Sequence, residues 1–340
     1  MNITRYFKQT VKILSIDGGG IRGYIPALIL EDLAERLKKR GKSPDFASHF
    51  DIIAGTSSGS LTALGLTAPA ADTEGNNKYL NVPRHSISDI VNMYEVRRNE
   101  IFPGMPLSGL KTIRQAFHEK YDDTGLKRVL EDLFGDRTME DTLTDVLISS
   151  YDLKTARPVM IQKSSKGQTR ENFFMKDVAR GSSAAPTYFE PHLMTSLSGN
   201  TEYCLIDGAM AANNPSLCAY VEARQLYPKA QKFIICSFGT GYSPQRWDYR
   251  KAQKWGFLDW ISPQNGTPLY HIMAEAQEQC VDSQVSAIPE VTYHRINPLL
   301  TNTKDNIDDA SIENMKLLKR IAQKEILERE DILDTIAEKI

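Results

Sequence analysis

The sequence predicts an α/β fold with a mostly parallel central sheet. Three observations favour this class: short apolar runs typical of buried strands, amphipathic helical segments directly after them, and glycine-rich turns where a strand passes into a helix. Ligands of open α/β sheets bind at the carboxyl ends of the strands, where the following helices begin. Residues at these turns are therefore the first candidates for a functional site.

A first strand and helix flank a run of glycines near the start of the chain. Residues 11–16 are an apolar run of strand type, and Asp17-Gly18-Gly19-Gly20-Ile21-Arg22-Gly23 follows directly. The next apolar residues recur at helical spacing, at Ile25, Leu28, Ile29, Leu33 and Leu37. Because backbone N–H groups at a helix N-terminus attract negative charge, Gly18, Gly19 and Gly20 are candidate donors to an anion.

A second strand and helix flank a serine. Residues 50–54 form the expected strand, residues 58–66 the helix, and Gly55-Thr56-Ser57-Ser58-Gly59 joins them. The pattern G-x-S-x-G is typical of the sharp turn that exposes a serine oxygen for nucleophilic attack. Such a pentapeptide also arises by chance, so its weight comes from the strand, the helix and the other glycine run. Ser57 is the candidate nucleophile, and the two glycines of the pattern support the turn.

Asp207 is the best candidate acid in the chain. Residues 203–206 have the pattern of a strand that ends in Asp207-Gly208-Ala209, and Asn213-Asn214-Pro215 opens a helix. An aspartate at a strand end, freed by Gly208, can face the same crevice as the other strand ends. The order of parts excludes an α/β-hydrolase, because only one strand–helix unit precedes the serine.

These three motifs resemble, in order and context, the motifs of patatin-like phospholipases, whose distant relatives include cytosolic phospholipase A2. Residues 178–186 are similar to the buried helix of that family, and residues 237–241 are similar to its strand end. The resemblance covers roughly residues 11–290. It implies a three-layer fold, with a catalytic domain at residues 11–296 and a helical C-terminal extension at residues 297–340 packed on the same domain.

The resemblance also implies a catalytic dyad in place of a triad. Ser57 would attack an ester carbonyl and carry the acyl group, and Asp207 would accept the serine proton. The oxyanion hole is expected at Gly18, Gly19 and Gly20. No cofactor and no metal is needed for these steps. The implied activity is hydrolysis of fatty acyl esters of glycerophospholipids, with lysophospholipids and galactolipids as close alternatives.

Two charged residues beside the glycines carry alternative roles. Arg22 is expected either to contact a phosphate or oxyanion or to lock the loop by bonding carbonyl oxygens. Asp17 is expected to cap the turn or the following helix rather than to act in catalysis.

The histidines offer the alternative to a dyad. The chain holds six: His49, His85, His118, His192, His271 and His294. None lies in a glycine-rich or elbow-like context, so ordinary structural roles are expected for most of them. His271 and His294 follow Asp207 in the hydrolase order and remain the triad candidates.

Long acyl chains would need an apolar channel and access to a membrane. Residues 91–110 are expected to supply part of this channel, and within them the apolar residues 101–107, broken by proline and glycine, are expected to form a mobile loop. Residues 67–88 are expected to form an exposed insertion that covers the site. The tryptophan segment, residues 247–261, holds all three tryptophans and three basic residues. Its composition favours either a membrane interface or a strap packed over the sheet edge. One or two amphipathic helices are expected within residues 312–336.

The composition of the chain limits its expected cellular location and its expected binding partners. With 41 basic and 43 acidic residues the chain gives no nucleic-acid signal, and no apolar run is long enough for a membrane span. The polar residues 1–10 leave no room for a signal peptide. Cys204, Cys218, Cys236 and Cys280 lack a ligand pattern and are expected to be reduced core residues. A cytoplasmic enzyme is expected, peripherally membrane-associated when acting, with a homodimer and a cyclic-nucleotide activator as further options.

Two other classes of function remain open. Some compact bacterial members of the family resemble effectors of anti-phage signalling, which a cyclic nucleotide activates and which degrade the cell membrane; no nucleotide motif is visible in this chain. A non-catalytic lipid-binding or storage protein is the other alternative. The intact Ser57 and Asp207 argue against it.

Overall fold

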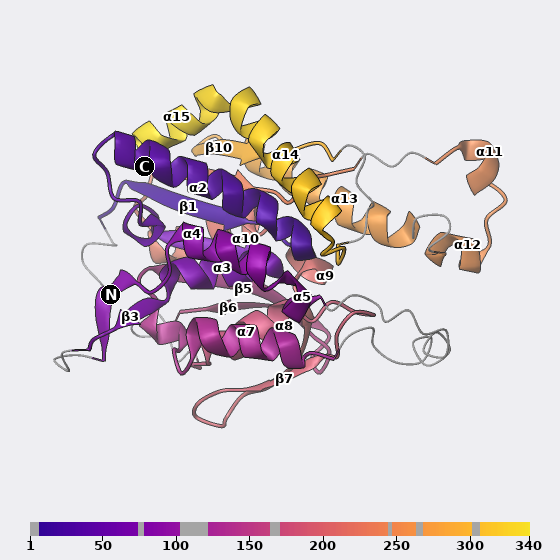
Figure 1. The fold of residues 1–340 in the computed structure, drawn as a ribbon, viewed down its shortest axis with the longest axis horizontal. Helices are drawn as coiled ribbons and strands as arrows, with labels where there is room; N and C mark the ends of the chain where they lie inside the picture. Colours follow the sequence, from indigo (N-terminus) through magenta and orange to yellow (C-terminus); the bar gives the residue numbers. More distant parts are fainter. Residues whose placement is uncertain are drawn as a thin grey trace.

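The computed structural model describes residues 7–73, 78–102, 122–163, 171–243, 247–262, 268–300 and 307–340. It confirms the expected class: an α/β fold with a mixed, mostly parallel sheet and helices on both faces (Figure 1). The strands of the main sheet are β1 Thr10–Ile16, β2 Ile52–Thr56, β5 Asp145–Asp152, β6 Arg157–Gln162, β7 His192–Thr195, β8 Glu202–Asp207, β9 Lys232–Phe238 and β10 Val291–Ile296.

The described helices follow these strands or extend from the sheet. Their bounds are α2 Tyr24–Lys39, α3 Ser58–Thr67, α4 Ile87–Val96, α5 Arg98–Ile101, α7 Thr124–Phe134, α8 Met175–Ser182, α9 Ala209–Ala212, α10 Ser216–Leu226, α11 Tyr249–Ala252, α12 Phe257–Ile261, α13 Pro268–Ser286, α14 Ile312–Glu328 and α15 Glu330–Lys339. Short 3-10 turns lie at Gly20–Gly23, Phe46–Ser48 and Met139–Asp141.

Five neighbouring strands of the sheet are parallel, in the order β10-β9-β1-β2-β5. Ile16 at the end of β1 pairs with Gly55 near the end of β2, so the two glycine-rich turns leave the sheet side by side. Because a helical segment begins after each turn, two helix N-termini lie next to each other at the carboxyl ends of β1 and β2.

Alternation along β1 divides the core into two layers. Val11 and Ile13 pack in a cluster with residues of α10 and α13, whereas Leu14 and Ile16 pack in a cluster with α2, α14 and α15. Side chains of a strand alternate between faces, and here both faces are covered. The apolar run at residues 11–16 is thus explained by burial on both sides.

Two strands meet end to end on one edge of β5. Strand β6 pairs antiparallel with residues 147–152 of β5 and occupies one edge. The other edge is shared: β2 pairs in parallel as far as Ser149, and β8 pairs antiparallel from Ser150 onward. Thr56 pairs with Ser149 and Asp207 pairs with Ser150, so the carboxyl ends of β2 and β8 point at each other.

One expectation for the loops is wrong. The described residues of the range 67–88 do not cover the site, because they contain a β-hairpin, β3 Pro69–Ala71 with β4 Tyr79–Pro83, that follows the far end of α3. That end lies about 15 Å from Ser57 by helix rise, and Figure 1 shows β3 on the opposite side from α9. Within residues 91–110, the described part lies mainly in α4 and α5, and Tyr94, Ile101 and Phe102 line an apolar pocket, as expected of a segment that supplies part of a channel. Most of the expected mobile loop at residues 101–107 falls outside the described residues. Residues 103–121 lie outside the described part.

The cysteines also differ in part from expectation. All four are free, but only Cys236 is buried; Cys204 and Cys218 are half-buried, and Cys280 is exposed on α13. Cys280 is therefore not a core residue.

The C-terminal helices extend the core. Figure 1 shows α14 and α15 lying over α2. Their fully buried residues, which belong to the same apolar cluster as α2, are Leu318, Ala322, Leu333, Ile336 and Ala337. Helices α14 and α15 thus pack on the same core as α2, whereas the division into a domain at residues 11–296 and an extension at residues 297–340 stays a prediction.

We expect Leu333→Ala to lower the free energy of unfolding by about 2–5 kcal/mol, because it deletes packed methyl groups and leaves a cavity. Leu333 has no exposed surface, whereas Leu327 on α14 is 75% exposed. Leu327→Ala is the matched control, with an expected change within about 0.5 kcal/mol. Denaturant unfolding measures both; equal stability of the two variants would show that α15 is not part of the cooperative core.

Candidate active site

Ser57 lies at the turn between β2 and α3 in a strained backbone conformation. Its φ of 52° and ψ of −123° are unusual for a residue with a side chain, and such strain concentrates at functional turns. The turn is tight because α3 packs against the strand ends: a Cβ on Gly55 would collide with the carbonyl of Gly59, and one on Gly59 with the carbonyl of Ile16. The two glycines of the pentapeptide are therefore required by close backbone approach.

Asp207 faces Ser57 directly. The Ser57 hydroxyl donates to Asp207 Oδ2 over 2.7 Å, and the Ala209 N–H donates to Asp207 Oδ1 over 2.8 Å. The two side chains are 8% and 3% exposed. Burial raises the pKa of Asp207 to about 6, although both hydrogen bonds favour the ionised form. A carboxylate with a raised pKa is a stronger base than one in water.

From the sequence we expect Asp207 to reach Ser57 from a strand parallel to its neighbours. The structure brings the two side chains together through an antiparallel strand instead. Strand β8 is antiparallel to β5, and Asp207 reaches Ser57 because β8 meets β2 head-on along β5. Gly208 allows the end of β8 to lie this close to β5, since a Cβ at this position would collide with the carbonyl of Ser149.

A shell of buried hydroxyls holds the turn. The Ser57 N–H donates to Ser182 Oγ over 2.9 Å, and the Ser182 hydroxyl donates to the carbonyl of Ser149 over 2.7 Å. On the other side, the Thr56 hydroxyl contacts both Ser149 Oγ and the carbonyl of Ala212. Sequence reasoning did not assign a role to Ser182; the signal was a small polar residue at the end of an otherwise buried helix, α8.

The glycine loop presents its backbone beside Ser57. The Gly18 N–H donates to the carbonyl of Asn213 over 3.3 Å, whereas the N–H groups of Gly19 and Gly20 have no acceptor among the described residues. Gly20 has a φ of +59°, and it lines the same pocket as Ser57. Of the three expected oxyanion donors, Gly19 and Gly20 are thus open, and Gly18 is engaged.

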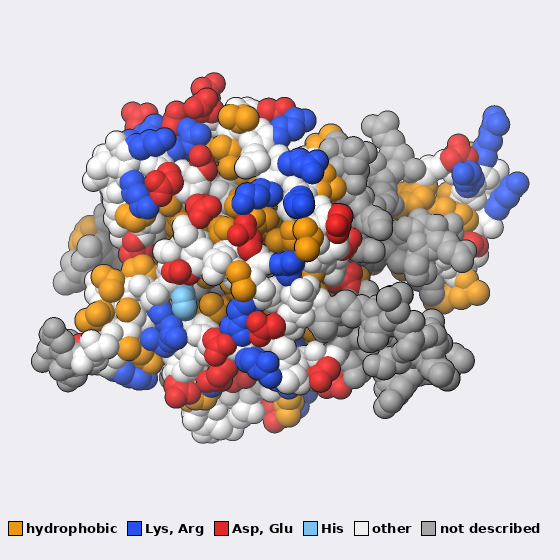
Figure 2. Space-filling model, viewed as in Figure 1, with side chains coloured by type: hydrophobic (Ala, Val, Ile, Leu, Met, Phe, Trp, Pro, Cys, Tyr) orange, Lys and Arg blue, Asp and Glu red, His pale blue; other side chains and the backbone are white. Residues whose placement is uncertain are grey.

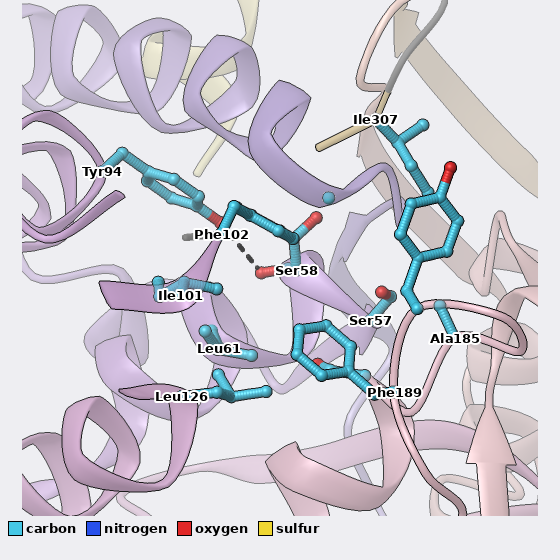
Figure 3. A pocket seen from close by; sticks show the side chains of 13 residues that line it. Ser57, Ser58, Leu61, Tyr94, Ile101, Phe102, Leu126, Ala185, Phe189 and Ile307 are labelled. Atoms are coloured by element: carbon cyan, nitrogen blue, oxygen red, sulfur yellow. Dashed lines mark hydrogen bonds between the residues drawn. The ribbon is translucent and has the colours of Figure 1, made fainter. Parts of the chain in front are cut away.

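An apolar pocket opens next to Ser57 (Figure 3), with an empty volume of about 490 Å³ that includes its open mouth. Its lining residues are Gly20, Ser57, Ser58, Leu61, Tyr94, Ile101, Phe102, Leu126, Ser183, Ala185, Tyr188, Phe189 and Ile307. Sequence reasoning missed Leu126 and Ile307, because each comes from a segment remote from the motifs. The carbonyl of Ile307 accepts the N–H of Ile21 over 2.8 Å, so the C-terminal part of the chain also fixes the glycine loop.

Asp17 is structural, but not as a cap. Neither helix after the loop receives a side-chain cap. Instead, Asp17 is buried and accepts from Arg295 Nη2 over 2.6 Å, and Arg295 also contacts Glu278. Burial raises the pKa of Glu278, and the charges of Arg295 and Arg22 oppose this rise. Arg22 does not line the pocket beside Ser57. Both expected roles of Arg22 therefore stay predictions.

No histidine in the described ranges hydrogen-bonds Ser57 or Asp207. His49 and His85 form hydrogen bonds with the backbone carbonyls of Ser43 and Leu133. His192 Nε2 lies 3.2 Å from Asp177 Oδ1. His294 pairs with Cys236 in the middle of β10, three strand positions from β2, which is about 14 Å at ordinary strand spacing. Burial and the charge of Lys339 lower the pKa of His294. The side chain of His271 and the whole of His118 lie outside the described residues.

No group of three or more His, Cys, Asp or Glu side chains in the described ranges is placed to hold a metal ion. In that same part of the chain, no helix combines the length and apolarity needed to cross a membrane.

We expect Ser182→Ala to lower the free energy of unfolding by about 1–3 kcal/mol, since the buried N–H of Ser57 loses its acceptor. The exposed Ser48, whose hydroxyl bonds the carbonyl of Asp45, provides the control Ser48→Ala. Thermal or denaturant unfolding measures both variants. Equal stability of the two proteins would show that Ser182 does not hold the turn.

The sequence of this chain is similar to proteins of one known family. A family model described as patatin-like phospholipase matches residues 14–219. Patatin-like protein 2 of Arabidopsis thaliana is 34% identical over 92% of this chain and 82% of its own length, and "Probable inactive patatin-3-Kuras 1" of Solanum tuberosum is 33% identical over 93% and 86%. The solved structure of VipD from Legionella pneumophila aligns with 92% of this chain and 67% of its own at 13% identity, with a TM-score of 0.33. The chain belongs to the patatin-like phospholipase family.

Proposed function

We propose that this protein hydrolyses fatty acyl esters of glycerophospholipids through Ser57 and Asp207. Family membership supports lipid acyl hydrolysis in broad terms. The observation that carries the finer proposal is the 2.7 Å hydrogen bond from the Ser57 hydroxyl to Asp207 Oδ2, at the wall of an apolar pocket.

The first step is attack on the ester carbonyl. Ser57 Oγ forms a bond to the carbonyl carbon while its proton passes to Asp207 Oδ2 along the existing hydrogen bond. Asp207 then returns this proton to the leaving alcohol oxygen as the carbon–oxygen bond breaks. An acyl-serine remains. Because one carboxylate serves both transfers, the step needs no histidine.

The glycine loop stabilises the charge that develops on the carbonyl oxygen. The N–H groups of Gly19 and Gly20, which have no acceptor among the described residues, are the proposed donors. A donor of this kind contributes about 3–4 kcal/mol in comparable sites. The Gly18 N–H would have to leave the carbonyl of Asn213 in order to join them.

Water releases the acyl group in the second step. Asp207 removes a proton from the water, the water oxygen bonds the acyl carbon, and Ser57 Oγ leaves and regains a proton. The products are a free fatty acid and the unmodified enzyme.

The pocket supports a lipid acyl chain as the part of the substrate that is bound. Its walls are mainly aliphatic and aromatic, including Leu61, Ile101, Phe189 and Ile307, and Figure 3 shows Ser57 beside them. Burial of an acyl chain against such walls contributes roughly 0.8 kcal/mol for each CH₂ group. The relative called probably inactive does not weaken this proposal, because that description concerns another chain, and this one retains Ser57 and Asp207 in contact.

We expect Ser57→Ala to lower kcat on a defined phospholipid by at least about a thousandfold, and Asp207→Asn by about a hundredfold or more. Mass analysis of the released fatty acids measures both. His294→Gln is the control, with activity expected within about twofold of the unaltered protein because His294 lies about 14 Å from β2. Retained activity in Asp207→Asn together with loss in His294→Gln or His271→Ala would replace the dyad with a triad.

The pH profile tests the role of Asp207. The active form is the carboxylate, and its pKa is raised from 3.8 to about 6. We therefore expect kcat/KM to be half-maximal near pH 6, to reach a plateau about one pH unit higher, and to approach a tenfold fall per pH unit at lower pH, as Asp207 gains a proton. Initial rates with a soluble short-chain ester measure this profile. Constant kcat/KM down to pH 4 would contradict the assignment of Asp207 as the base.

A further inference from the structure

We propose that the tryptophan segment is a docking surface for a membrane that contains anionic lipids. This inference rests on the proposed function, since an enzyme that acts on membrane phospholipids must reach them at a bilayer. The described part of this surface is α11, α12 and the residues around them.

The aromatic rings of the segment form a small cluster of their own. Trp255 packs edge-on against Trp247, with ring centroids 6.5 Å apart, and edge-on against Trp260, at 5.1 Å. Edge-to-face pairs at these distances are stabilising, so the three rings fix the two short helices relative to each other.

Large apolar side chains next to this cluster face the solvent. Tyr249 is 77% exposed, Phe257 76% and Leu258 74%. A strap packed over the sheet edge would bury these side chains, so that alternative is excluded. Side chains of this size grouped on one surface mark an interaction site, because their exposure to water is unfavourable.

The charges of the segment complement an anionic surface. Arg250, Lys251 and Lys254 are exposed, and none of the three forms an ion pair with a described residue. The two acids of the segment are turned onto backbone groups: Asp248 accepts the N–H of Lys251, and Asp259 accepts the N–H of Gly256. With three cations and two acids, the segment carries a net charge of +1 on a chain whose net charge is −2.

The surface projects from the same end of the molecule as the candidate active site. In Figure 1, α11 and α12 extend beyond the end at which α5 and α9 lie, and Figure 2 shows basic and apolar side chains together on this projection. Helix α13, which α12 contacts, adds the exposed side chains of Leu269, Ile272 and Met273 in its first turns. Further along α13, Gln277 bonds the backbone of Ala211 and Asn213, directly after the Asp207 turn.

A bilayer interface fits this combination better than a second copy of the chain. Tryptophan and tyrosine are favoured at the level of lipid headgroups, and lysine and arginine are attracted to anionic lipids. A second copy would bring the same cations, Arg250, Lys251 and Lys254, toward each other across a two-fold axis, which is unfavourable.

Binding to vesicles tests the surface independently of hydrolysis. The experiment uses the whole 340-residue chain with Ser57→Ala and measures cosedimentation with vesicles of phosphatidylcholine, with and without phosphatidylglycerol. We expect stronger binding when phosphatidylglycerol is present and weaker binding at high salt. On the Ser57→Ala background, Phe257→Ser with Leu258→Ser, and separately Lys251→Glu with Lys254→Glu, are each expected to weaken binding roughly tenfold or more.

The matched control is Leu327→Ser with Lys324→Glu on α14, which changes one exposed apolar and one exposed basic side chain elsewhere. Unaltered binding in the two segment variants, or an equal loss in the control, would overturn the proposal. A dimer in analytical ultracentrifugation that Phe257→Ser with Leu258→Ser converts to a monomer would assign the surface to a second copy instead. Turnover of a soluble ester by the unaltered protein tests the proposed function separately, so the two can fail independently.

Discussion

The arrangement of the site depends on one structural constraint: two strands end against each other on a single edge of β5. Because β6 occupies the opposite edge, β2 and β8 share what remains, and their last residues pair with the adjacent Ser149 and Ser150. The turn after β2 carries Ser57, and β8 ends in Asp207. The 2.7 Å hydrogen bond between these side chains therefore follows from the pairing of three strands.

Burial at this junction has opposite effects on structure and chemistry. It makes the ionised form of Asp207 less favourable and so raises its pKa to about 6, which strengthens it as a base. It also leaves the polar groups of a strained turn without water. Ser182 and Thr56 replace the missing water by hydrogen-bonding the backbone of Ser57, Ser149 and Ala212. The strained backbone conformation of Ser57 is tolerated because the surrounding hydrogen bonds and packing hold the turn in place.

The sequence allowed the local parts of this arrangement to be predicted, because each depends on neighbours in the chain. The strand, the glycine turn and the helix around Ser57 follow from an apolar run, a pentapeptide and helical spacing. The antiparallel course of β8 did not follow, since strand direction is set by pairing across the sheet. Likewise, the partner of Asp17 is Arg295, 278 residues away, which no local pattern indicates. Ile307, which lines the pocket from beyond β10, was missed for the same reason.

The central claim is that Asp207 activates Ser57 as a nucleophile, and covalent labelling tests it most directly. A fluorophosphonate reacts when an activated serine oxygen displaces fluoride from phosphorus, and peptide mass analysis locates the adduct. We expect a single adduct at Ser57 in the unaltered protein, formed much more slowly in Asp207→Asn. Absence of labelling, an adduct on another residue alone, or an unchanged rate in Asp207→Asn would contradict the claim.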